Sequence, residues 1–114
     1  MPRELSTYFE DILVSISKIE RYTNGMSKES FKQNEMVMDA VVRNLEVIGE
    51  AVKKIPEDIK LEYDTVSWRK IAGLRDILIH EYFGVNIYII WYVIENKVHE
   101  LKIVVCELFD LFGY

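Results

Sequence analysis

The sequence predicts an all-α fold, an up-down bundle of four or five helices. Apolar residues recur every three or four positions through most of the chain, which is the period of an amphipathic helix. Short connections with helix-ending residues separate these segments, and no segment alternates strongly enough to predict a strand. The chain has 114 residues, of which 50% are hydrophobic, so we expect one domain over residues 1–114 with its own core.

The first predicted helix carries an apolar stripe at helical spacing. The stripe consists of Leu5, Phe9, Ile12, Leu13, Ile16 and Ile19. This helix is expected to end near Asn24 and Gly25, because such residues commonly terminate helices. Ser27 is a suitable N-cap for a short following helix, with the acidic Glu29 in its first turn.

A long helix is predicted over residues 34–55, and Pro56 ends it because the residue before a proline avoids the helical region. Pro56 can also begin a short new helical turn. The long helix has two apolar stripes, which predicts burial from two sides, either within a bundle or in a bundle and an oligomer interface. The stripes are Val37, Val41, Leu45, Ile48, Val52 and Ile55, and Met36, Ala40, Val47 and Ala51.

Two further helices complete the predicted bundle. Ser67 is expected to cap a helix from Trp68 toward His80, with Val66 and Ile71 at the spacing of a hydrophobic staple. Gly84 interrupts the pattern, and a last helix is predicted over residues 86–111. Its apolar seam has heptad-like spacing. The seam consists of Ile87, Trp91, Ile94, Val98, Leu101, Val105, Leu108 and Phe112.

Charge and cysteine content exclude several classes of protein. The net charge of −5 argues against general coating of nucleic acids, although Arg69, Lys70 and Arg75 form a locally basic stretch. The only cysteine, Cys106, lies in an apolar run and is expected to be buried, which fits a reducing cytoplasm. The N-terminus lacks the apolar core of a signal peptide, and no apolar run is long enough to predict a membrane span.

The segment Arg75-Asp-Ile-Leu-Ile-His-Glu-Tyr82 concentrates polar chemistry within an apolar helix. Arginine binds phosphate with a planar fork of donors, and histidine transfers protons near neutral pH. Asp76 and His80 are four residues apart and share a helix face, so Asp76 can orient the imidazole. Arg75 and His80 are about 140° apart around an ideal helix. Either Arg75 reaches around, or the helix unwinds before Gly84, or a second subunit completes the site.

A structural interpretation of these residues competes with a catalytic one, because polar clusters are often structural. Arg75 would then form a buried ion pair, and His80 would be satisfied by Asp76. Glu50 is a candidate buried partner of Arg75 or His80, with an orienting role. His99 is expected at the surface. Metal sites are not expected, since the sequence lacks the Cys pairs and the Glu-x-x-His or His-x-x-x-His spacings that such sites use.

Three segments resemble HepT-type HEPN proteins: residues 44–51 (NLEVIGEA), 68–75 (WRKIAGLR) and 75–82 (RDILIHEY). The resemblance covers nearly the whole chain. It implies a helical homodimer in which the Arg75 and His80 motifs of both subunits line one cleft. It further implies a metal-independent endoribonuclease, the toxin of a type VII toxin–antitoxin pair. Asn is common after the motif arginine in this family, so Asp76 leaves open whether that position must also donate a hydrogen bond.

The partner implied by the resemblance is a minimal nucleotidyltransferase (MNT) antitoxin, which transfers AMP to the tyrosine of His-x-Tyr, here Tyr82. An AMP group two residues from His80 would oppose phosphate entry by its size and charge. An alternative function is a non-catalytic module that binds a nucleotidyltransferase or a nucleotide, which the acidic composition favours. A third is a helical dimer with no site. We expect the dimer surface on the second and last long helices, because they carry more apolar surface than one core requires.

Overall fold

In the computed structural model, every regular element within residues 4–80 and 87–112, the part of the chain that the structure describes, is a helix. The prediction of an all-α fold is therefore confirmed. In chain order the helices are α1 (Leu5–Thr23), α2 (Lys28–Lys32), α3 (Glu35–Val52), α4 (Glu57–Glu62), α5 (Trp68–His80), α6 (Ile87–Tyr92), the π-helix η2 (Val93–Lys97) and α7 (Val98–Phe112).

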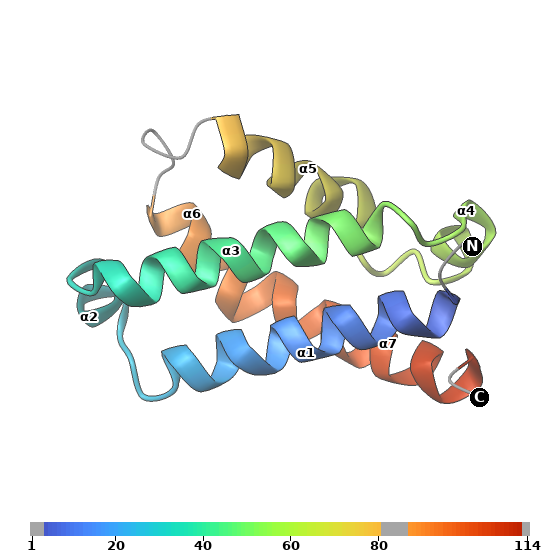
Figure 1. Cartoon of the computed structure of the whole chain (residues 1–114), viewed down its shortest axis with the longest axis horizontal. Helices are drawn as coiled ribbons and strands as arrows, with labels where there is room; N and C mark the ends of the chain where they lie inside the picture. Colours follow the sequence, from blue (N-terminus) through green and yellow to red (C-terminus); the bar gives the residue numbers. More distant parts are fainter. Residues whose placement is uncertain (1–3, 81–86, 113–114) are drawn as a thin grey trace.

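The long helices pack side by side along the long axis of the molecule. Helix α1 packs against α3 and α7, and α3 packs against α5 (Figure 1). The short helices cover the two ends: α2 contacts α3 and α6 at one end, and α4 lies at the other end, the one at which α1 begins. None of the described helices combines the length and the apolar character needed to cross a membrane.

Side chains from all the long helices form one continuous core. Four residues of the predicted stripe of the first helix, Phe9, Ile12, Ile16 and Ile19, have no exposed surface. The other two, Leu5 and Leu13, are partly buried against the core. The core is completed from α3 and the C-terminal elements by Val41, Leu45, Ile48, Val52, Ile90, Val93, Val98, Leu101, Val105 and Leu108, among others. Burial on this scale is the main force that holds the helices together.

The helix ends follow the local chemistry of the sequence. As predicted, Ser27 caps α2: its hydroxyl accepts a hydrogen bond from the Ser30 amide at 3.1 Å, and the Ser30 hydroxyl accepts one from the Ser27 amide at 2.9 Å. Gly25 has φ of 76°, a left-handed conformation that glycine adopts without the steric cost of a side chain. The Asn34 side chain accepts from the Val37 amide and caps α3.

Helix α3 ends at Val52, three residues before the predicted end at Ile55. The amides of Lys54 and Ile55 donate to carbonyls three residues back, at 3.0 and 3.2 Å, so the chain leaves the helix in a tight turn. Ile55 is still buried, which explains why its hydrophobicity resembled a continuation of the helix. Pro56 is the N-cap of α4, one position before its first residue.

The predicted last helix over residues 86–111 is divided by a π-helical turn. The amide of Val98 donates to the carbonyl of Val93, five residues earlier, and this is the spacing of a π-helix. The most deeply buried residues here are Ile90, Val93, Val98 and Leu101, so the step of five coincides with the π turn. The extra residue shifts the buried face away from the predicted seam positions Trp91 and Ile94, which are only half-buried.

Candidate functional site

The start of α5 is fixed by packing and by hydrogen bonds. The Trp68 indole nitrogen donates to the carbonyl of Tyr63 at 2.9 Å, and the Ile71 amide donates to the carbonyl of Ser67 at 3.0 Å. Val66, Trp68 and Ile71 are all buried, in agreement with the predicted staple. The position of the motif residues further along α5 is therefore set by an anchored first turn.

The backbone of α5 is helical from Trp68 to His80. Unwinding between Arg75 and His80 is thus excluded, and these positions stay about 140° apart around the helix. Positions 76 and 80 share a face, as expected of residues four apart. The side chains of Arg75 and His80 and the whole of Tyr82 lie outside the described part of the structure, so their predicted roles stay predictions.

Asp76 pairs with a cation from the neighbouring helix. The Nζ of Lys53, at the C-terminal end of α3, lies 3.5 Å from the Asp76 Oδ1, and the two side chains are 37% and 54% exposed. Such exposed ion pairs contribute at most about 1 kcal/mol to stability. The pair joins the end of α3 to the middle of α5 and places a positive charge beside the motif.

Sequence reasoning missed Lys53, because only the packing of α3 against α5 brings it to Asp76. The local sequence offers one weak signal, since the position lies just before Pro56 and therefore near a helix end.

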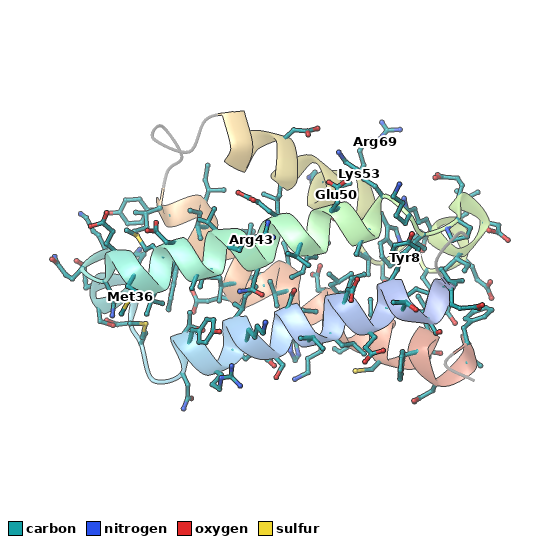
Figure 2. The ribbon with its side chains drawn as sticks, viewed as in Figure 1. Tyr8, Met36, Arg43, Glu50, Lys53 and Arg69 are labelled. Atoms are coloured by element: carbon teal, nitrogen blue, oxygen red, sulfur yellow. The ribbon has the colours of Figure 1, made fainter. Side chains whose placement is uncertain are left out.

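Glu50 is exposed, so the prediction of a buried carboxylate at this position is wrong. It lies one turn before Lys53 on α3, near Lys53 and on the side of the bundle from which Arg69 projects (Figure 2). The buried polar residue of this segment is Asn44, whose amide nitrogen donates to the Ala40 carbonyl at 2.8 Å within the same helix. The apolar pattern of α3 could not distinguish these two positions, since neither carries an apolar side chain.

Residues outside the motif separate into core and surface positions. His99 is exposed on α7, as predicted. Cys106 is also exposed, which contradicts the prediction of a buried thiol: Val104 and Val105 face the core, and the next position turns outward. Trp91 packs on Phe31 with ring centroids 5.1 Å apart, which supports a structural role. Among the side chains that the structure describes, which do not include that of His80, no group of His, Cys, Asp or Glu is arranged to hold a metal ion.

A family model described as "Ribonuclease HepT-like" matches residues 12–108. The matched region extends from the middle of α1 to near the end of α7 and includes all of α5. It therefore covers the candidate motif together with the helices that position it.

Similar proteins with related names occur in archaea and bacteria. A protein of Methanocaldococcus jannaschii, provisionally named an RNase, is 46% identical over 86% of this chain and 82% of its own length. A protein of Caldanaerobacter subterraneus, also provisionally named an RNase, is 44% identical over 89% of this chain and 90% of its own length. A Thermococcus cleftensis protein named "Probable ribonuclease HepT" is 40% identical over 90% of this chain and 93% of its own length. No solved structure matches the chain at a comparable level.

Proposed function

The chain belongs to the HepT-like ribonuclease family, and from this premise we propose that it is a metal-independent endoribonuclease toxin of a type VII toxin–antitoxin system. The observation that supports the proposal most directly is the unbroken helix α5, which carries Arg75, Asp76 and His80 within the region matched by the family model. The names of the similar proteins agree with ribonuclease activity.

The proposed reaction uses the 2′-hydroxyl of RNA as its nucleophile. The 2′-oxygen forms a bond to the adjacent phosphorus and the bond from phosphorus to the 5′-oxygen breaks, which leaves a 2′,3′-cyclic phosphate and a 5′-hydroxyl. The 2′-oxygen loses one proton and the 5′-oxygen gains one, so the overall step is balanced. In this scheme His80 accepts the first proton as a general base or donates the second as a general acid. Arg75 stabilises the additional negative charge of the transition state. An intramolecular nucleophile makes metal activation of water unnecessary, and DNA is not cut because it lacks this hydroxyl.

We further propose that two subunits form the complete site. Positions 75 and 80 diverge around a helix that does not unwind between them, so a rigid single helix presents them to different directions. A homodimer that brings two copies of α5 to one cleft supplies an arginine and a histidine on each side. Asp76 acts as the positioning residue for His80 on the same helix face.

Regulation is proposed to act on Tyr82. A nucleotidyltransferase antitoxin would catalyse attack of the tyrosine oxygen on the α-phosphorus of ATP, with pyrophosphate as the leaving group and loss of the phenolic proton. The product carries a bulky nucleotide and a negative phosphodiester two residues from His80. Both its size and its charge oppose entry of an RNA phosphate.

The test of the proposed activity is RNA cleavage by the purified protein in EDTA, with identification of the end groups. Cyclic phosphate ends with wild-type protein, and loss of cleavage in His80→Ala, are the expected results. Cleavage that continues at the wild-type rate in His80→Ala would overturn the role of His80. A requirement for added divalent metal would overturn metal independence.

The acidic composition favours a second candidate function, that of a non-catalytic module that binds a nucleotidyltransferase or a nucleotide. This candidate predicts a folded dimer that neither cleaves RNA nor arrests growth when expressed. Isothermal titration with a purified nucleotidyltransferase partner, and with ATP alone, would then detect binding without cleavage.

A further inference from the structure

A pocket of about 550 Å³ lies between α4 and the first turns of α5. Three cationic side chains line it: Lys60, Arg69 and Lys70. Glu57 and Asp64 line it as well, so the positive charges exceed the negative ones by one. The Trp68 side chain, which is itself buried, forms part of its wall. The pocket is thus a depression with a slight positive charge at one end of the helix that carries the motif.

The cations at this end of α5 are available to a ligand. Arg69 and Lys70 are exposed, and neither forms an ion pair with another residue in the described ranges. Figure 2 shows the Arg69 side chain extending away from the bundle, on the side of Lys53. An exposed guanidinium without a carboxylate partner can offer its full fork of donors to a phosphate.

One stripe of α5 connects Arg69 to the motif. Positions 69, 73, 76 and 80 follow one another at steps of four, three and four, and positions 69 and 80 differ by only about 20° around the helix. Asp76 is the one carboxylate on this stripe, and the Nζ of Lys53, 3.5 Å from its Oδ1, offsets its negative charge. A chain of phosphates that follows the stripe would therefore run from Arg69, over Gly73 and the neutralised Asp76, to position 80.

The middle of the stripe is open. Position 73 is glycine, and a Cβ atom placed there would meet no heavy atom within 4 Å. Tight packing does not explain the glycine at this position. Because it has no side chain, the helix backbone is more accessible between Arg69 and Asp76. A nucleic-acid backbone can approach a helix more closely at such a position.

The distribution of charge along the chain agrees with an anion-binding role for this region. Residues 53–76 contain six of the fourteen Lys and Arg residues and five of the nineteen Asp and Glu residues. The rest of the chain contains eight cations and fourteen acids. An acidic protein with one region of weakly positive charge holds a polyanion through that region and repels it elsewhere.

We propose that the α4–α5 pocket and the stripe from Arg69 through Gly73 to position 80 form a phosphate track that holds the RNA backbone on one side of the cleavage point. The track rests on the proposed ribonuclease function and adds to it a substrate-length requirement. Positions 69 and 80 are separated by about 16 Å along the helix, since each residue rises about 1.5 Å. That length corresponds to about five nucleotides of a stacked strand at about 3.4 Å each.

The test uses chimeric oligonucleotides in which one ribonucleotide, at a mapped cleavage position, is flanked by DNA of varied length on either side. Extending the flank on one side to about five nucleotides is expected to lower KM, with little change in kcat, because distant phosphates add binding only. Arg69→Gln should raise KM by about tenfold for the long substrate, to the value of the short one. Its kcat, and its KM for the short substrate, should remain close to wild type.

Arg21→Gln is the matched control, because Arg21 is an exposed arginine near the C-terminal end of α1. It should leave both substrates unaffected. A second variant, Gly73→Gln, places a long side chain in the middle of the track and should also raise KM for the long substrate alone. Equal losses for long and short substrates in Arg69→Gln, or no loss for either, would overturn the track.

Binding measurements separate failure of the track from failure of the proposed function. The affinity of each protein for long and short DNA–RNA chimeras is measured by fluorescence anisotropy over a range of salt concentrations. Loss of the Arg69 contact should reduce the magnitude of the slope of log K against log salt by about 0.7, the value expected for one single-strand phosphate. If wild type binds the long chimera with this Arg69-dependent slope but cleaves nothing, the track stands and the catalytic proposal fails. Absence of binding, or an unchanged slope in Arg69→Gln, rejects the track.

Discussion

At the scale of single residues, Arg75 and His80 are the two positions to which the proposed reaction assigns catalytic roles. His80→Ala should reduce kcat for RNA cleavage by about 10²- to 10⁴-fold, the usual contribution of a general acid or base. Arg75→Lys should also lose most of the activity, because an ammonium group cannot supply the bidentate fork of a guanidinium. Single-turnover cleavage rates measure both, and circular dichroism checks that each variant is folded. Full activity in Arg75→Lys would show that the site needs only a point charge.

Asp76 tests how the imidazole is positioned. Its ion pair with Lys53 is exposed, so Asp76→Ala should change the free energy of unfolding by no more than about 1 kcal/mol. If Asp76 orients His80, the cleavage rate of Asp76→Ala should fall much further than this small change in the free energy of unfolding can explain. Asp76→Asn keeps an acceptor and adds a donor, and the pH profile of its cleavage rate should shift because the carboxylate charge beside the imidazole is lost. Lys53→Met removes the same ion pair but should leave that pH profile largely in place.

Tyr82 is the residue on which regulation is proposed to act. Tyr82→Phe should keep ribonuclease activity and lose the AMP group that wild type gains on co-expression with an active nucleotidyltransferase. Intact-mass spectrometry of the co-expressed proteins measures this. AMP that is still attached to Tyr82→Phe would exclude Tyr82 as the acceptor.

At the scale of helices, the sequence predicted where elements exist better than where they end. Apolar stripes identify α1, α3, α5 and α7 because burial of one face determines the spacing of their residues. The end of α3 was misplaced because Ile55 is buried from within a turn. The π turn at Val93–Lys97 was missed because its one extra residue resembles ordinary variation between steps of three and four.

Gly73 allows a prediction about the stability of α5. It lies inside the helix, and an added Cβ meets nothing within 4 Å. Gly73→Ala should therefore stabilise the protein by up to about 1 kcal/mol, which is the difference in helix propensity between the two residues. Urea denaturation of the two proteins measures the change. A loss of stability would mean that another subunit packs against this position.

At the scale of the whole molecule, the bundle and the ribonuclease family follow from the sequence, whereas the surroundings of the site do not. The motif residues are recognisable because they are unusual in an apolar helix. The exposure of Glu50 and the contact between Lys53 and Asp76 depend on how α3 rotates against α5, which no local pattern specifies. The exposed position of Cys106 has the same origin, since a helix in an apolar run still presents one side to solvent.

Assembly is the remaining prediction for the whole molecule. Apolar side chains stay exposed on the second and last long helices, including Met36 at 79% and Ile103 at 58%. Exposed apolar surface of this kind can be covered when two subunits associate. We expect a homodimer at micromolar concentration, and small-angle scattering or sedimentation measures its mass. A monomer at these concentrations would contradict both the dimer and a site shared between subunits.

The exposed Cys106 gives each chain one thiol that reagents can reach, because the sequence has no other cysteine. A maleimide spin label would therefore attach at a single known place on α7, and a homodimer would carry one such label on each subunit. Pulsed electron paramagnetic resonance would then measure a single distance between the two labels of a symmetric dimer. That distance constrains how the two copies of α5 face each other, without any change to the residues of the motif.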